Sequence, residues 1–237
     1  MNAQPLVSVV VPTLDEAAQL PALLDHLAAL PGHWEVIVAD GGSRDGSGQV
    51  VGARAGRAPF ARLVHAPRGR AAQMNAGAAL ARGEGLLFLH ADTRLPHGAY
   101  EALRRALGQP HVSGGNFALR FDGDDRFSVV LGRWYALQRR LGVYYGDSAV
   151  WLCACAWGRL GGFRLLPIME DYDLVRRLEH LPAPARTVCL PGPALTSSRR
   201  WRRLGIGRTI LTWVAIRWLY LAGMPAERLA ALYRNVR

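Results

Sequence analysis

The first 110 residues alternate short apolar runs with helical patterns, and this alternation constrains the fold more than any other feature of the sequence. The apolar runs are rich in β-branched residues and are expected to be strands at 6–11, 35–39, 62–66 and 85–90. Helical patterns lie between and after them, at 16–30, 46–55, 71–82 and 96–107. Strands that are apolar throughout and separated by helices are typical of a parallel sheet covered on both faces. This part therefore predicts a doubly wound α/β half.

The pattern changes after residue 110. We expect two more strands and two amphipathic helices, the strands at 112–121 and 147–152 and the helices at 125–141 and 169–181. Four prolines between 181 and 193 indicate a loop and a sheet edge, because proline cannot donate a ladder hydrogen bond. An apolar helix follows at 204–224, and Pro225 stands near the start of a last helix. We therefore expect an α/β domain with halves 1–110 and 111–203, and a C-terminal helical extension at 204–237.

The chain carries a net charge of +11, and all 29 of its basic residues are arginine. Such a charge indicates an anionic partner, which could be nucleic acid, membrane phospholipid or a phosphorylated substrate. Cys153, Cys155 and Cys189 form neither an even set nor the two pairs of a zinc site, so we expect reduced thiols in a cytoplasmic protein. The first apolar run is too short for a secretory signal.

Polar residues follow each of the first four predicted strands. In a parallel α/β sheet, ligands bind outside the carboxyl ends of the strands, so these side chains should converge on one rim. They are Thr13, Asp15 and Glu16, then Asp40, then Arg68 and Arg70, then His90 and Asp92. The dinucleotide fingerprint is absent, because Gly46-Ser47-Gly48 follows the second strand and Val51 replaces the third glycine. A P-loop is excluded by the lack of lysine.

Six sequence blocks resemble those of the family 2 glycosyltransferases, in the order found in that family. They include Pro12-Thr13-Leu14-Asp15-Glu16, a block that runs from Asp40 to Ser47, the start of a helix at Arg70, His90-Ala91-Asp92, Gly162 with Glu170-Asp171, and Arg199-Arg200-Trp201. The sequence departs from the family pattern at three places: Gly41 and His90 replace aspartates, and Ser197 or Ser198 replaces a glutamine. His90-Ala91-Asp92-Thr93 is similar to a short bacterial subgroup.

This resemblance implies a GT-A fold, α/β with a Rossmann-like, mostly parallel sheet and helices on both faces. It implies a nucleotide-binding half at 1–110 and an acceptor half at 111–203. The activity implied is inverting, hexosyl-type transfer from a nucleotide-diphosphate sugar, with UDP-sugar favoured, to an acceptor hydroxyl of a small or lipid-linked molecule. Mg²⁺ or Mn²⁺ would assist, held by Asp92 with His90.

The resemblance also assigns individual residues. Donor binding is expected from Pro12, Thr13, Asp15, Glu16, Asp40, Arg70, Asn75, Ala91, Asp92, Arg199, Arg200 and Trp201. Asp147 and Gly162 are expected on the acceptor side, and Asp171, with Glu170, is the candidate catalytic base. A carboxylate suits that role because an apolar wall and neighbouring like charges can raise its pKa.

Each of these assignments has a structural alternative. Asp40 could accept a hydrogen bond from the imide N–H of uracil, or it could close a turn. Asp92 could bind a metal or begin an Asx turn, and His90 could be structural. Asp171 could belong to an acidic first helical turn. Asp45 could cap the helix that follows it.

Arginines and aromatic residues crowd 199–222. A spanning helix there is disfavoured by Arg208 and Arg217, so we considered an interfacial helix on an anionic membrane. A helix buried on the domain or in a homodimer is the alternative. Two other functions are alternatives: a sugar nucleotidyltransferase, whose Gly-rich basic loop is missing here, and a nucleic-acid-binding module, whose motifs the sequence lacks. We expect no nucleic-acid partner.

Overall fold

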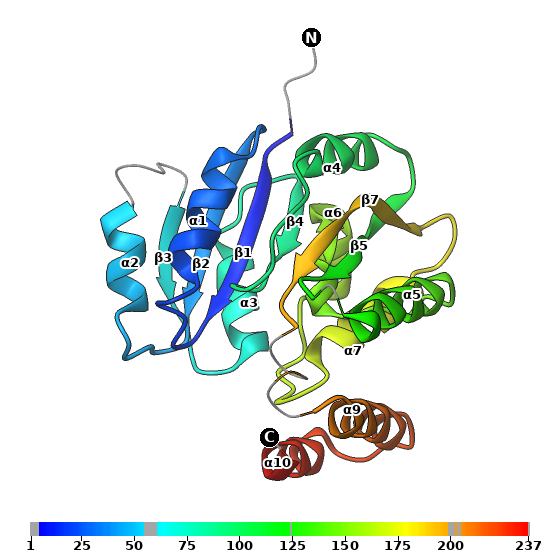
Figure 1. The fold of residues 1–237 in the computed structure, drawn as a ribbon. Helices are drawn as coiled ribbons and strands as arrows, with labels where there is room; N and C mark the ends of the chain where they lie inside the picture. Colours follow the sequence, from blue (N-terminus) through cyan, green and yellow to red (C-terminus); the bar gives the residue numbers. More distant parts are fainter. Residues whose placement is uncertain (1–4, 55–60, 124, 199–201, 203–204, 237) are drawn as a thin grey trace.

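Seven strands of the computed structural model form one sheet in the order β3-β2-β1-β4-β6-β5-β7 (Figure 1). The structure describes residues 5–54, 61–123, 125–198, 202 and 205–236. The strands are β1 Val7–Thr13, β2 Trp34–Asp40, β3 Ala61–His65, β4 Gly85–Phe88, β5 Val112–Phe121, β6 Trp151–Cys153 and β7 Arg186–Thr196. Strand β6 is antiparallel to both neighbours, and the other pairs are parallel. The mostly parallel sheet predicted from the sequence is confirmed.

Strand β1 lies inside the sheet, between β2 and β4, and its apolar side chains point to both faces. Val9 and Val11 belong to the core on one face, and Val10 belongs to the core on the other. All three are fully buried. Successive side chains of a strand point to opposite faces, so an unbroken apolar run requires cover on both.

Helices supply that cover on the two faces. Helices α1 (Leu20–Ala29), α2 (Ser47–Arg54) and α4 (Ala99–Leu107) contribute to one core. Helices α3 (Arg70–Ala79), α6 (Ala154–Leu160) and α7 (Glu170–Glu179) contribute to the other. Helix α5 (Arg126–Arg140) packs along β5, with Asp125 as its N-cap accepting a hydrogen bond from the N–H of Ser128 at 2.9 Å.

Three sequence predictions differ from the structure in the second half. The strand expected at 147–152 is wrong at its start, where Gly146–Ser148 forms the 3-10 turn η1 and β6 begins only at Trp151. Helix α6 was not predicted. For the proline-rich segment 181–193 we expected loop and a sheet edge, and the edge is confirmed, because β7 is an edge strand. The strand extends through residues 186–193, and its register with β5 shifts beside Pro191 and Pro193.

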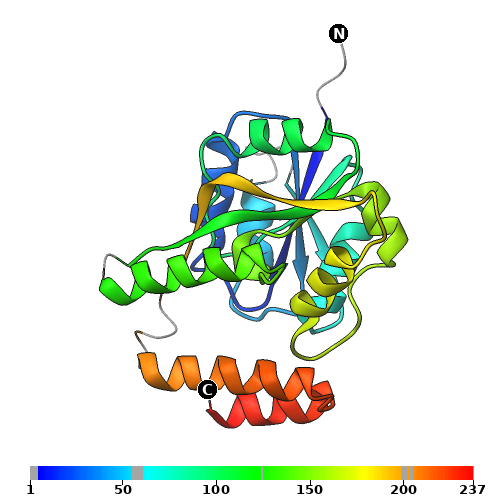
Figure 2. The same ribbon diagram turned by 90° about the vertical axis from the view of Figure 1, so that its right-hand side faces the viewer.

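The chain ends in a hairpin of two helices, α9 (Ile206–Leu221) and α10 (Ala226–Val236), which lies below the sheet domain (Figures 1 and 2). Ile216 of α9 and Leu229 of α10 pack against Met169 and Tyr172 at the start of α7. The apolar helix predicted at 204–224 is thus found, slightly shorter. No helix within the described residues combines the length and hydropathy needed to cross a membrane.

Candidate active site

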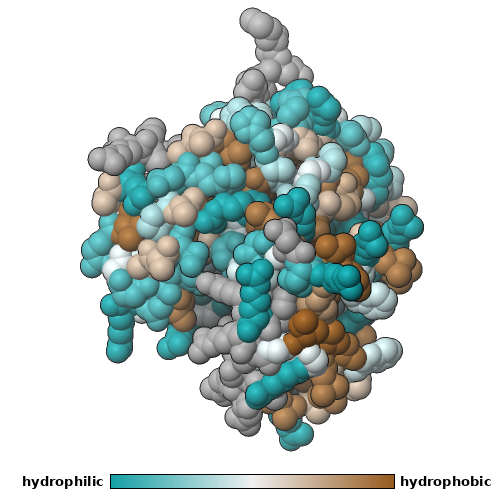
Figure 3. Space-filling model, viewed as in Figure 1, coloured by the Kyte–Doolittle hydropathy of each residue, from teal (hydrophilic) through white to brown (hydrophobic). Residues whose placement is uncertain are grey.

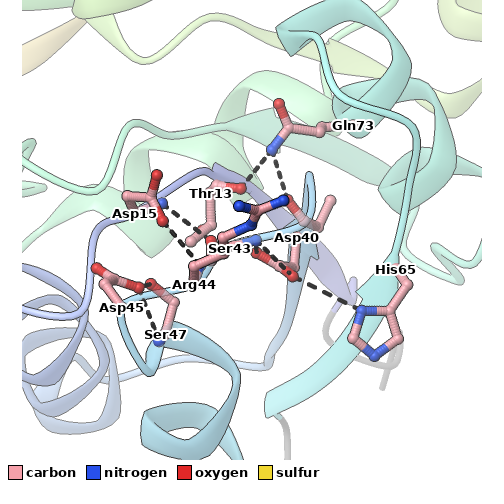
Figure 4. A network of polar contacts seen from close by, with 10 residues as sticks. Thr13, Asp15, Asp40, Ser43, Arg44, Asp45, Ser47, His65 and Gln73 are labelled. Atoms are coloured by element: carbon pink, nitrogen blue, oxygen red, sulfur yellow. Dashed lines mark hydrogen bonds and ion pairs between the residues drawn. The ribbon is translucent and has the colours of Figure 1, made fainter.

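The carboxyl ends of β1, β2 and β3 lie level with one another. The strand register pairs Thr13 with Asp40, and Asp40 with His65. Gln73 of α3 joins the first two strands, since its side-chain amide donates to the carbonyl oxygens of Thr13 and Ala39 (Figure 4). The side chain is 3% exposed, so both bonds are shielded from water.

Gln73 also explains a departure from the family pattern. A Cβ at Gly41 would stand 2.9 Å from the amide nitrogen of Gln73, closer than real Cβ contacts. An aspartate at position 41 would therefore require the Gln73 side chain to shift from its two hydrogen bonds. Sequence reasoning did not single out Gln73, because its partners lie far along the chain.

Asp40 closes the turn that follows β2. Its carboxylate accepts hydrogen bonds from the backbone N–H of Ser43 at 3.2 and 3.3 Å and from the Ser43 hydroxyl. His65 Nδ1 lies 3.6 Å from Oδ2 of the same carboxylate. The side chain is almost fully buried. The structure thus shows Asp40 closing a turn, which is one of its two expected roles. The other role, contact with the base of a nucleotide donor, stays a prediction.

The loops after β1 and β2 are held together by hydrogen bonds (Figure 4). The N–H of Asp15 donates to the hydroxyl of Ser43, and the N–H of Arg44 donates to the carboxylate of Asp15, both at 2.9 Å. Asp15 has a φ of 55°, an uncommon value that these bonds fix. The N–H of Glu16 similarly donates to the hydroxyl of Ser47 at 3.0 Å. These expected donor-binding residues therefore line one rigid rim.

Asp45 binds both the start of α2 and the loop after β1. It accepts hydrogen bonds from the N–H of Ser47 at 3.0 Å and from the N–H of Ala17 at 2.7 Å. The pKa of Asp45 is lowered by its hydrogen bonds, first from the Ser47 hydroxyl and then from Ala17. Asp45 therefore has the contacts expected of a residue that caps the start of α2.

A second group of polar side chains lies between α3 and α7. Arg70, the first residue of α3, is ion-paired with Glu170 at 3.3 Å. Burial raises the pKa of Glu170, and the charge of Asp171 adds to this, while Arg70 opposes it. Asp171 is only partly buried, and its two oxygens accept from the N–H of Gly146 at 2.8 Å and of Tyr172 at 2.7 Å. The two neighbouring acids therefore differ: Glu170 is anchored to an arginine, and Asp171 is accessible.

His90 and Asp171 meet beside Gly146. A Cβ on Gly146 would lie 3.1 Å from Nε2 of His90 and 3.2 Å from an oxygen of Asp171. The end of β4, the turn η1 and the start of α7 thus come together at one point. Asp92 lies two residues after His90 and is partly buried. Strands β2 and β4 flank β1, so the tips that carry Asp40 and Asp92 are separated by roughly 10 Å, two strand spacings.

Asn75 and Gly162 have structural contacts. The Asn75 amide donates to the carbonyl oxygen of Phe163 at 2.8 Å, and the N–H of Phe163 donates back at 2.9 Å. Gly162 has a φ of 83°, and a Cβ there would meet the Asn75 oxygen at 2.8 Å. This pair fixes the loop before α7 onto α3.

The remaining predicted residues are placed as follows. Pro12 lies in β1, Ala91 is buried after β4, and Asp147 belongs to η1. Arg199, Arg200 and Trp201 lie outside the described residues.

The sequence model of the family described as glycosyl transferase family 2 matches residues 8–164, well over half the chain. The chain belongs to this family.

Two relatives illustrate the extent of the similarity. A PGL/p-HBAD biosynthesis glycosyltransferase of Mycobacterium bovis is 39% identical over 103 residues, which are 42% of this chain and 39% of that protein. An undecaprenyl-phosphate 4-deoxy-4-formamido-L-arabinose transferase of Pseudomonas paraeruginosa is 32% identical over 162 residues, 63% of this chain and 46% of that protein. The chain thus spans less than half the length of either relative.

Solved structures share the fold. A mannosyltransferase of Pyrobaculum calidifontis, in complex with GDP-Man and Mn²⁺, has a TM-score of 0.67 at 22% identity and covers 91% of this chain and 65% of its own. Glucosyl-3-phosphoglycerate synthase of Mycobacterium tuberculosis, with Mn²⁺, UDP and phosphoglyceric acid, has a TM-score of 0.63 at 18% identity and covers 93% and 80%. The GT-A fold expected from the sequence is confirmed.

The described part of this family 2 glycosyltransferase has no cluster of three or more His, Cys, Asp or Glu side chains suited to a metal. A caged structural ion therefore does not fit these residues. Mg²⁺ and Mn²⁺ bind to proteins through one or two carboxylates and take further oxygens from phosphates and water. Asp92, partly exposed at the tip of β4, fits that second mode.

Tyrosine rings form a wall beside Asp171. Tyr145 stacks on Tyr172 with ring centroids 5.5 Å apart, and Tyr172 meets Tyr220 of α9 edge-on at 5.9 Å. Burial raises the pKa of Tyr145 to about 12, so its hydroxyl keeps its proton at neutral pH. Tyr135 of α5 approaches the other side of Tyr145 at 6.0 Å. The wall thus runs from α5 to α9 past the candidate base.

Proposed function

We propose that this protein transfers a hexosyl group from a nucleotide-diphosphate sugar to an acceptor hydroxyl. The observation that carries the proposal is the meeting of His90 and Asp171 around Gly146, because it joins the donor-side strand tips to the acceptor-side helix α7. Membership of family 2 supports glycosyl transfer. Neighbouring structures that contain GDP-Man and UDP-GlcNAc support a nucleotide-sugar donor.

In this proposal the rim after β1 and β2 binds the nucleotide, with a uridine donor favoured. Asp92, with His90, would hold Mg²⁺ or Mn²⁺ against the diphosphate, and Mn²⁺ is present in two structural neighbours. When bound, the ion neutralises negative charge on the leaving diphosphate. Arg70 would contact the same diphosphate from the start of α3, where a helix N-terminus already favours anions. Glu170 would position Arg70 through their ion pair.

Asp171 is proposed as the base. Backbone N–H groups of Gly146 and Tyr172 fix the orientation of its carboxylate, which is needed for proton transfer from a bound hydroxyl. The hydroxyl oxygen then attacks the anomeric carbon from the side opposite the diphosphate, and this single displacement inverts the configuration. One relative is named as an undecaprenyl-phosphate sugar transferase, which supports a lipid-linked acceptor. The bacterial subgroup, the cytoplasmic location and a homodimer stay predictions.

Nucleotide binding and turnover test the proposal separately. UDP, GDP or dTDP with Mn²⁺ is expected to raise the unfolding temperature of the wild-type protein, because a ligand that binds only the folded state stabilises it. Asp92→Ala should abolish the metal-dependent part of this shift. Asp171→Asn should keep the shift but slow transfer by about 10²–10⁴-fold, the usual contribution of a general base.

Asp25→Asn is the matched control, because Asp25 is an exposed aspartate of α1 whose ion pair with Arg54 of α2, at 3.0 Å, lies outside the candidate site. It should leave both readouts unchanged. No thermal response to any of the three nucleotides would contradict the proposal.

A further inference from the structure

The exposed apolar side chains of this protein are concentrated on two helices. Among the described residues, large apolar side chains that are exposed lie on or directly after α5 and α9, with three exceptions at Leu80, Leu165 and Leu232. Scattered single apolar residues are normal on a protein surface, but a contiguous group marks an interaction site. Figure 3 shows hydrophobic residues gathered at the lower right, over the region of α9 in Figure 1.

Helix α5 carries an apolar stripe that faces away from the sheet. Val130, Trp134, Leu137 and Leu141 recur at spacings of three and four residues, so they lie on one face. Trp134 is 53% exposed and Leu141, directly after the helix, is 77% exposed. This stripe is not needed for packing against β5, which uses Leu131 on the other side of the helix.

Helix α9 carries a matching stripe. Leu211 is 72% exposed and Trp218 is 68% exposed, and Val214 lies between them on the same face. Trp213 of α9 packs against the cluster that holds Leu131 of α5, so the two helices are joined. Both views show α5 and α9 side by side (Figures 1 and 2). We call the exposed residues of the two stripes the α5–α9 surface.

The charged side chains of helices α5 and α9 are all arginines. Neither helix contains an aspartate or glutamate. Exposed arginines stand beside the apolar stripes at 126, 133 and 140 of α5 and at 208 of α9. Two copies meeting through this surface would bring like charges together, because the same patch contacts itself in a two-fold dimer. An anionic lipid surface instead neutralises the arginines while it takes up the apolar side chains.

We propose that the α5–α9 surface docks this protein on an anionic phospholipid bilayer. The sequence left an interfacial helix at 199–222 as one of two alternatives; the proposal rests on the described helix α9 and adds α5, which the sequence did not indicate. The tyrosine wall, from Tyr135 of α5 to Tyr220 of α9, passes Tyr172 next to Asp171. Docking would thus place the candidate base close to the lipid surface. This last step rests on the proposed function, whereas the docking itself does not.

Vesicle flotation without any nucleotide tests the docking. The full chain should float with vesicles of phosphatidylcholine and phosphatidylglycerol, and flotation should be lost with phosphatidylcholine alone or at high salt. Trp134→Ser/Leu137→Ser and Leu211→Ser/Trp218→Ser should each lose flotation, which shows that both helices contribute. Arg133→Gln/Arg140→Gln should weaken binding to the anionic vesicles. All these side chains are exposed, and unchanged unfolding temperatures would show that the variants still fold.

Leu80→Ser is the matched control. Leu80 is an exposed leucine at the end of α3, near the amino ends of the strands, and its loss should not change flotation. Wild-type protein that stays unbound with anionic vesicles, or double variants that float as the wild type does, would overturn the proposal. A dimer in sedimentation that the double variants dissolve, without lipid binding, would show that a second copy covers the surface. Because no donor is present, these outcomes are separate from failure of the proposed transferase activity.

Discussion

Glu35 shows what one buried carboxylate does in this sheet. It lies near the start of β2, where its oxygens accept hydrogen bonds from the hydroxyl of Ser8 and from the N–H of Arg82 at 2.6 Å, and Arg62 of β3 lies 2.9 Å away. Burial by itself would raise the pKa of Glu35, but the Ser8 and Arg82 hydrogen bonds and the Arg62 charge lower it below the ordinary value. The ionised group therefore joins three strands at the edge opposite the candidate site.

This environment predicts a specific pH dependence of stability. The pKa of Glu35 is lower in the folded protein than its ordinary value of 4.5, so its stabilisation is present above that pH and is lost as the pH falls through the folded pKa. Glu35→Gln should unfold more easily near neutral pH, by about 1–3 kcal/mol, as for charge-assisted hydrogen bonds. It should also lose stability less steeply in acid. Urea unfolding of both proteins across the acid range measures this, and parallel curves would refute it.

Residues of the candidate site could be predicted from the sequence where they stand at the end of a predicted strand, because this fixes their location in the fold. Asp40, His90 and Asp92 follow strands of a parallel sheet, so their common rim follows from topology. Gln73 could not be found in this way, because its role depends on two carbonyl groups from separate strands. The division of Glu170 and Asp171 between a buried ion pair and an accessible carboxylate likewise depends on packing.

At the scale of elements, the first half was predictable and the second half less so. Strands β1, β2 and β4 contain the apolar runs 9–11, 36–39 and 86–88, so these strands and their alternation with helices follow from the sequence pattern. Helix α6 is short and includes Gly158, and β7 contains Pro191 and Pro193, so local propensity contradicts both. Both form because tertiary packing supplies their partners: α6 completes the second core, and β7 pairs with β5 at the edge of the sheet.

Helix α3 carries three residues of the site, Arg70, Gln73 and Asn75, and a glycine determines how closely it approaches β1. A Cβ on Gly77 would collide with the side chain of Val10 in the centre of β1. Gly77→Ala should therefore lower the free energy of unfolding by about 1–3 kcal/mol, as overpacked cores do. Because α3 must shift to relieve the contact, nucleotide-induced stabilisation should weaken as well.

Gly52→Ala in α2 is the control for helix propensity. A Cβ there meets nothing within 4 Å, so the exchange should stabilise the protein by about 0.5–1 kcal/mol. Chemical unfolding of the two variants compares them directly. If Gly77→Ala and Gly52→Ala change the free energy of unfolding equally and with the same sign, the packing of α3 on β1 leaves room for a methyl group.

On the scale of the whole molecule, the C-terminal hairpin has its own apolar contacts. Leu229 and Ile216 pack with Met169 and Tyr172, in a cluster separate from the two cores of the sheet. The sequence predicted a helical extension at 204–237 but could not predict which face of α9 packs on the sheet domain, because apolar residues lie nearly all round that helix. Because the hairpin packs beside Asp171, the stability of the hairpin affects the acceptor side of the candidate site.

These separate clusters predict that the hairpin can open while the sheet stays folded. Leu229 is fully buried, so Leu229→Ala should cost about 2–5 kcal/mol, and the loss should fall on the local opening of α9 and α10. Amide hydrogen exchange should accelerate in these helices and at the start of α7, with β1 and β4 unchanged. Leu103→Ala in α4, which removes an equally buried leucine from the core of the sheet, should instead accelerate exchange in the strands. If Leu229→Ala accelerates exchange in β1 to the same extent as in α9, the hairpin and the sheet unfold as one cooperative unit, and the acceptor side cannot open independently.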